Sequence, residues 1–261
     1  MTSELLDHFF SAFHIFVVLF VLIFLVRRIA LGERKMKLIY YAFGMACFLL
    51  SDLYWVVYGF VRPDMRMPFA ANEIAEWAMF LMFAASLDAA IPKPRRLPPG
   101  KIFATVGFTI GNTLLWIGWS GEWVQDMFTG VCVGYLLCMI VACLTQTNAL
   151  RRAEWILLGL LCAVLLTAQA GTFYAPEEIR GMLDTFCYIL LFAVTAGFFL
   201  RVIASRKVAS PESCCSLAFV TFAWTILTMY MSAGMWYNLA LAADALSFPL
   251  LYTSLVREVA A

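Results

Sequence analysis

The sequence contains few charged residues: Asp, Glu, Lys and Arg make up 13% of its 261 residues, whereas hydrophobic residues make up 64%. Soluble domains are about 45–50% apolar and about 25% charged. The composition therefore excludes a water-soluble fold and predicts a protein embedded in a lipid bilayer. The 18 basic and 17 acidic residues nearly cancel, and the basic ones fall where membrane topology requires them, so no nucleic-acid partner is expected.

Histidine is scarce, and both residues, His8 and His14, fall near the start of the first apolar segment. A haem clamped between histidines of two helices is therefore excluded. No lysine falls inside a predicted span, which excludes a Schiff-base chromophore. The eight cysteines lack the C-x-x-C or Cys/His spacing of a metal site, and the chain lacks a Gly-rich phosphate loop. We expect neither a metal nor a cofactor.

The N-terminus lacks the basic n-region of a secretory signal: the stretch "MTSELLDHFF" carries Glu4 and Asp7 and neither Lys nor Arg. The first apolar segment is therefore expected to remain as a membrane span. The connections between apolar segments are short, which predicts a single transmembrane domain over residues 1–261.

Apolar segments of spanning length predict an all-α, polytopic transmembrane helix bundle. A spanning helix needs about 20 mostly apolar residues. This length indicates about nine spans, at residues 9–26, 38–60, 71–91, 102–119, 124–145, 153–173, 179–200, 213–232 and 236–256.

Lys and Arg alternate strongly between the two sets of connections. One set holds 15 of the 18 basic residues and the other holds Arg62, Arg66 and Arg180. Basic residues are enriched in cytoplasmic connections. The alternation therefore predicts an N-terminus outside and a C-terminus in the cytoplasm.

Two successive spans carry G-x-x-x-G patterns, "GFTIG" at Gly107 and Gly111 and "GVCVG" at Gly130 and Gly134. Small residues at this spacing let helix backbones approach closely. We interpret both patterns as internal packing, with dimerisation as the alternative.

Four carboxylates lie within predicted spans, all in the outer half of the bilayer. At 1.5 Å per residue, Asp52 in "LLSDLYWVVYGF" and Asp244 lie about 12 Å below the outer boundary, and Glu76 and Asp184 about 7 Å below it. An ionised carboxylate at the bilayer centre costs at least ~2.5 kcal/mol, so such groups turn inward, pair, or meet water. The four acids are therefore expected to face a polar interior.

Aromatic residues share helix faces with these acids, which predicts an outward-facing acidic and aromatic pocket. Carboxylates and aromatic faces together suit a small cationic ligand. The alternative is structural, with each acid paired to a neighbour such as Arg180, one turn from Asp184. Trp224 is expected in the pocket wall, and the predicted ligand-binding residues are Asp52, Trp55, Tyr58, Glu73, Glu76, Trp77, Asp184, Tyr188 and Asp244.

Several functions fit such a pocket. Sensing or binding a small ligand is favoured over transport of a small molecule or ion, because transporters usually show internal repeats with paired broken helices, whereas here Pro249 is the single clear intramembrane proline. Pro249 is expected to bend its helix and free backbone carbonyls. An intramembrane enzyme is a third possibility, with Asp52 and Asp244 as a carboxylate dyad.

The stretch from residue 44 to 87 resembles the polytopic sensor regions of bacterial membrane signalling proteins, such as some diguanylate cyclases and histidine kinases. The matching elements are Ser51–Trp55 at the end of one span, Pro68 in the loop, and Glu73 or Glu76 at the start of the next. The resemblance implies a multi-pass module of the bacterial cytoplasmic membrane, and because no output domain follows, we expect either a stand-alone sensing or ligand-binding module or a partner of a separate signalling protein.

A shorter stretch, "RPDMRMPFAANEI", is similar to a loop and helix of the quinol-interacting anchor subunits of molybdenum oxidoreductases. Pro63, Arg66, Asn72 and Glu73 carry this similarity. It implies, as a further alternative, the anchor subunit of a redox complex.

Overall fold

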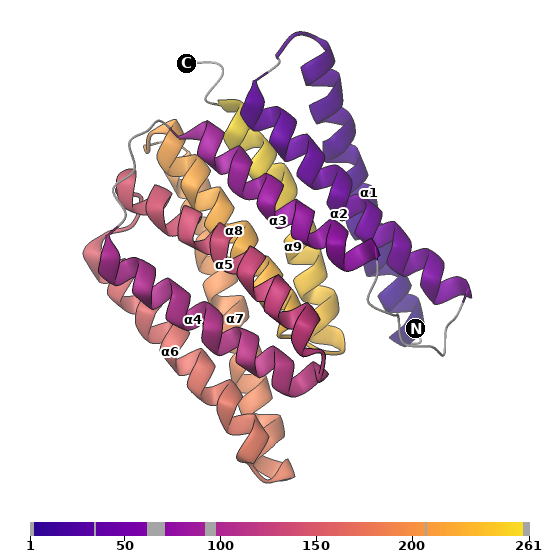
Figure 1. Cartoon of the computed structure of the whole chain (residues 1–261), viewed down its shortest axis with the longest axis vertical. Coiled ribbons are helices and arrows are strands. Elements are labelled where there is room, and N and C mark those ends of the chain that lie inside the picture. Colours follow the sequence, from indigo (N-terminus) through magenta and orange to yellow (C-terminus); the bar gives the residue numbers. More distant parts are fainter. Residues whose placement is uncertain (1–2, 34, 62–70, 92–97, 207, 258–261) are drawn as a thin grey trace.

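The computed structural model describes residues 3–33, 35–61, 71–91, 98–206 and 208–257, and these residues form nine α-helices and no strand (Figure 1). The all-α prediction is therefore confirmed. The helices are α1 (Ser3–Ala30), α2 (Met36–Val61), α3 (Ala71–Ala90), α4 (Pro99–Ser120), α5 (Trp123–Gln146), α6 (Arg152–Tyr174), α7 (Glu177–Ser205), α8 (Pro211–Tyr230) and α9 (Met235–Arg257).

Eight of these helices are long and apolar enough to cross a membrane, so the chain is an integral multi-pass membrane protein. The exception among the nine described helices is α3, where Glu73, Glu76 and Asp88 lower the hydropathy of a 20-residue helix. α3 packs against α2, α5 and α8. The sequence predicted nine spans, and the structure supports nine helices with eight candidate spans.

The helices extend beyond the predicted apolar segments because backbone hydrogen bonding continues past the last apolar residue. Lys37 and Lys101 consequently lie in the first turns of α2 and α4, whereas the sequence placed both outside the spans. Both remain at helix ends, near where charged side chains can reach the membrane interface.

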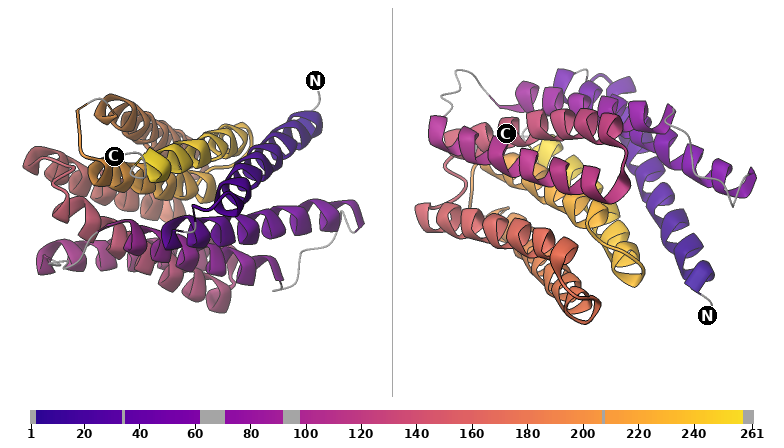
Figure 2. Two further views of the ribbon diagram at one scale, coloured as in Figure 1. Left: turned by 90° about the horizontal axis from the view of Figure 1, so that it is seen from above. Right: turned by 60° about the horizontal axis from the view of Figure 1, so that its bottom comes forward.

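α8 forms the centre of the bundle. It packs against α3, α5, α7 and α9, and Phe219 and Phe222 on this helix are fully buried. α1 lies at one edge against α2 and α9, whereas α4 and α6 lie on the opposite side, as Figures 1 and 2 show from three directions. The bundle is therefore asymmetric, with α9 between α1 and the central helix.

Close helix packing confirms the interpretation of the second glycine pattern. A Cβ atom added at Gly130 would lie 2.1 Å from Oγ1 of Thr113, and one at Gly134 would lie 2.9 Å from Cγ2 of Thr109, both on α4. Gly111 faces Leu166 of α6, whereas a Cβ at Gly107 would meet nothing within 4 Å. Three of the four glycines thus mark internal contacts.

α9 continues as one helix through Pro249. The carbonyl oxygen of Phe248 accepts a hydrogen bond of 2.9 Å from the Tyr41 hydroxyl of α2. A backbone carbonyl beside the proline is therefore used in helix packing, which fixes α9 against α2.

Candidate functional site

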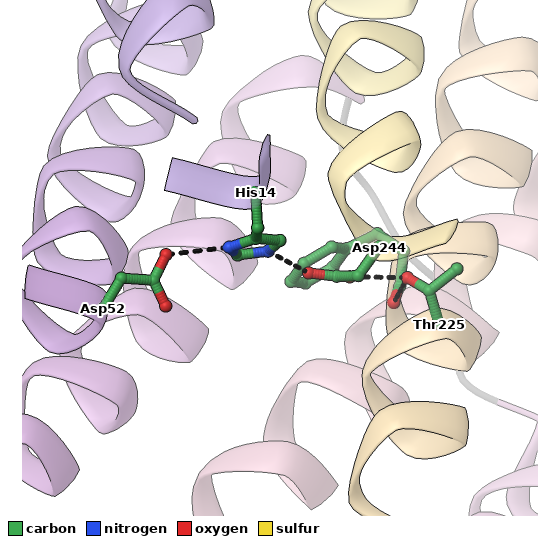
Figure 3. Close-up of polar contacts among 5 residues, drawn as sticks. His14, Asp52, Thr225 and Asp244 are labelled. Carbon is green, nitrogen blue, oxygen red and sulfur yellow. Dashed lines mark hydrogen bonds and ion pairs between the residues drawn. The ribbon is translucent and has the colours of Figure 1, made fainter. Parts of the chain in front are cut away.

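His14 of α1 lies between two aspartates from different helices (Figure 3). Its Nδ1 atom is 2.9 Å from Oδ2 of Asp52 on α2, and its Nε2 atom is 3.2 Å from Oδ2 of Asp244 on α9. The Thr225 hydroxyl of α8 donates to the other oxygen of Asp244 at 2.7 Å. We call His14, Asp52 and Asp244 the histidine–aspartate bridge, and it connects α1 to α2 and α9.

The bridge is buried except at one end. The His14 and Asp244 side chains are 2% and 0% exposed, whereas the Asp52 side chain is 18% exposed. Asp52 is therefore the most exposed of the three members.

All three members lie at similar depth from the same end of the bundle. His14 follows Leu6 by eight residues, Asp52 precedes Tyr58 by six, and Asp244 follows Met235 by nine, which at 1.5 Å per residue gives depths of about 9–14 Å. This is the end that the distribution of Lys and Arg predicts to be external. The structure thus places His14 between Asp52 and Asp244, which the sequence had matched only by depth.

Aromatic rings cover the bridge on its side toward the opposite end of the bundle, the end that is predicted to be cytoplasmic. Phe48 and Phe248 contact His14 with ring centroids 5.2 and 5.8 Å away, and Phe222 packs on Phe248 at 5.6 Å. Each lies about one turn beyond Asp52, Asp244 or Thr225 on its own helix, and all three are buried. We call these three rings the aromatic layer. The aromatic layer therefore covers the polar group on that side.

Glu76 forms a second polar group next to the bridge. Its two oxygens accept hydrogen bonds from Ser51 at 3.0 Å and from Tyr230 at 2.7 Å. Ser51 directly precedes Asp52, so the two groups share one turn of α2. Glu73 lies one turn before Glu76 on α3 and is buried.

The predicted aromatic residues are distributed around the outside of these groups. Trp77 donates to Thr129 at 2.9 Å and stacks on Phe128. Trp55 is 54% exposed on the surface of α2, and Tyr58 stacks on Tyr54. A ligand contact for Trp55, Tyr58 and Trp77 stays a prediction.

Asp184 and Tyr188 lie on α7, which packs on α6 and α8 rather than on α1 or α2. Tyr188 contacts Trp236, with ring centroids 5.7 Å apart. Arg180, the expected partner of Asp184, donates to the carbonyl of Thr172 at 3.0 Å. Trp224 donates to the carbonyl of Leu191 at 3.2 Å. The structure therefore separates Asp184 from the other three acids.

The sequence analysis missed His14, because it weighed histidine only as a haem ligand. A signal was present: His14, Val18, Val21 and Leu25 follow helical spacing, and the structure buries all four. A histidine on the buried stripe of a spanning helix, at the depth of two aspartates, is a partner for their charge.

No family model, curated protein or solved structure matches this chain. The described residues hold no group of three or more His, Cys, Asp or Glu side chains arranged to bind a metal ion.

The bridge has a defined proton requirement. A neutral imidazole donates one hydrogen bond, so with two ionised aspartates one ring nitrogen would face a carboxylate oxygen without a proton. Both contacts form when the ring is doubly protonated or when one aspartate carries a proton, and the net charge is then −1. One further proton makes the bridge neutral, which lowers the cost of burying it in the membrane.

Proposed function

We propose that this protein is a proton-responsive sensing module of the bacterial cytoplasmic membrane, acting with a separate signalling protein. The observation that carries the proposal is the position of His14 between Asp52 and Asp244, on three helices and inside the membrane-spanning region. Intramembrane ionisable groups of this kind are the usual basis of proton relays and switches.

Proton loss would change the contacts between helices. When the two contacts of the bridge hold fewer than two protons in total, one ring nitrogen faces a carboxylate oxygen with no proton between them. That contact then changes from attractive to repulsive. Because α1 contacts mainly α2 and α9, both contacts of the bridge lie at the interfaces that hold α1 in the bundle, together with the hydrogen bond from Asn238 of α9 to Asp7. Protonation of the bridge therefore favours one position of α1 and its loss favours another.

The geometry favours a proton over the organic cation that the sequence suggested. The imidazole ring of His14 already occupies the space between the two carboxylates. The same ring separates Asp52 from Asp244, so the two do not form the direct carboxylate dyad of an intramembrane enzyme.

The aromatic layer favours sensing over transport. Proton transfer across the membrane needs polar groups on both sides of the site, whereas Phe48, Phe222 and Phe248 close one side of the bridge. For the redox-anchor alternative, Asn72 and Glu73 are buried, and Pro63 and Arg66 lie outside the described residues.

Infrared difference spectroscopy of the protein in liposomes, recorded while external pH is stepped, tests the proposal. We expect a band of the protonated bridge, from the imidazolium ring or from a protonated aspartate, that appears as pH falls, and its loss in Asp52→Asn and His14→Gln. Asp184→Asn is the matched control, because Asp184 is also an intramembrane acid but lies outside the bridge, and its spectrum should keep the band. An unchanged band in both bridge variants would rule out the proposal.

A further inference from the structure

A long cavity of about 440 Å³ lies between α4, α5, α6 and α8, on the other side of α8 from α9. Its lining is almost entirely apolar, including Phe108, Leu137, Ile140 and Leu166. Lys101 and Trp155 lie at one end, the end predicted to be cytoplasmic, and Trp116 and Tyr230 lie at the other.

The cavity is partly open at the surface of the bundle, and Ile156 in its lining is exposed. Water does not fill apolar cavities readily, because it finds few hydrogen-bond partners there. The cavity therefore suits an apolar molecule taken from the membrane.

The shape suits one extended chain. Lys101 and Trp116 are fifteen residues apart on α4, so the cavity runs for about 22 Å along the helix axis at 1.5 Å per residue. Residues of α4, α5, α6 and α8 line it, and its open side lets a chain enter from the membrane.

Lys101 supplies a charge at the cavity's end. It is the one charged residue among the described lining residues, and its ammonium lies 3.8 Å from the centre of the Trp155 ring and 3.2 Å from the Thr145 hydroxyl. Glu154, the neighbouring carboxylate on α6, is already engaged by Arg201 and by the backbone N–H of Arg151. Within the described part of the chain, Lys101 forms no ion pair with a carboxylate.

We propose that the cavity binds a long-chain fatty acid, with its carboxylate on Lys101 and its alkyl chain extending toward Trp116. A single ammonium matches a single carboxylate, and the Thr145 hydroxyl can donate a second hydrogen bond to it. The site is independent of the histidine–aspartate bridge, since it shares none of its residues.

Binding of radiolabelled palmitate to the purified protein in detergent tests the proposal. Loss of the charge-assisted contact in Lys101→Gln should weaken binding about tenfold or more, whereas Lys101→Arg should keep most of it. Arg152→Gln, which removes an exposed charge at the same end of the bundle, is the matched control and should bind as wild type does.

A second variant tests the cavity rather than the charge. Gly159 lines the cavity, and a Cβ there would meet nothing within 4 Å, so Gly159→Leu should fold normally, fill the space and abolish binding. Uncharged hexadecanol should compete at least about tenfold less well than palmitate. Wild-type affinity in Lys101→Gln, equal competition by hexadecanol, or equal competition by phosphatidylglycerol would overturn the proposal.

Discussion

At the scale of single residues, one imidazole ring is the shared partner of two intramembrane acids, Asp52 and Asp244. Asp244 is fully buried, and its two oxygens are satisfied by His14 and Thr225. Glu76 is satisfied separately by Ser51 and Tyr230. These three acids therefore have different partners: Asp52 and Asp244 share His14, whereas Glu76 is hydrogen-bonded by Ser51 and Tyr230.

Removal of the ring should destabilise the protein strongly. In His14→Leu, Asp52 and Asp244 would face each other without a cation between them, and breaking a buried pair in this way costs about 3–5 kcal/mol. We expect a clear fall in the unfolding midpoint in detergent. Adding Asp52→Asn and Asp244→Asn to His14→Leu should restore much of the lost stability, because no buried charge then remains unpaired.

His8→Gln serves as the control for this experiment, since His8 lies on the exposed side of the same helix. Equal stability of His14→Leu and His8→Gln would mean that the bridge contributes nothing to folding.

At the scale of elements, helix contacts depend on small residues and on partnered polar residues. α5 approaches α4 closely because Gly130 and Gly134 leave room for Thr113 and Thr109. α3 stays within the bundle despite its acids, since Glu76 obtains hydrogen bonds from two neighbouring helices. Hydropathy alone therefore underestimates how well α3 fits within the bundle, because a hydropathy scale treats a hydrogen-bonded carboxylate as if it faced lipid.

Two glycine substitutions separate packing from helix propensity. Gly130→Ala should destabilise the protein by about 1–3 kcal/mol, because its Cβ would overlap the branched side chain of Thr113. Gly107→Ala should be neutral or stabilise by up to about 1 kcal/mol, since its Cβ enters open space and alanine favours helix. Unfolding of both variants in the same detergent measures the difference, and a similar effect of the two would contradict the packing interpretation.

At the scale of the whole molecule, the bundle has two chemically different ends. The bridge and Glu76 lie toward the end that holds the N-terminus of α1 and the C-terminus of α2. Lys37 and Lys101 lie toward the opposite end. Which end faces the cytoplasm follows from the 15 to 3 division of Lys and Arg, and it stays a prediction.

Cysteine labelling from outside the cell measures this orientation. Tyr174 and Val208 are 91% and 89% exposed and lie at opposite ends of the bundle. An impermeant maleimide should label Tyr174→Cys in intact cells and Val208→Cys only after the membrane is opened. The native cysteines are buried or half-buried, so the unmodified protein is the background control. The reverse pattern would invert the predicted topology.

The membrane class, the helical fold and the approximate helix positions could be predicted from the sequence, because the length of an apolar segment and its flanking charges are local properties. Helix boundaries were less exact, as Lys37 and Lys101 show, because a helix does not stop where its apolar run stops. The shared depth of Asp52 and Asp244 could also be predicted from the sequence, because it depends only on the rise per residue of a helix.

Tertiary structure alone decided which polar groups meet. His14 is 38 residues from Asp52 and 230 from Asp244, and although the spacing in α1 places His14 on the stripe with Val18, Val21 and Leu25, it does not identify the helices that this stripe meets. Asp184 resembles the other acids in sequence yet lies on α7, away from them. A helix that is apolar on all sides does not specify its neighbours or its rotation, because lipid and protein interior suit its surface almost equally. Those choices depend on packing of the complete bundle.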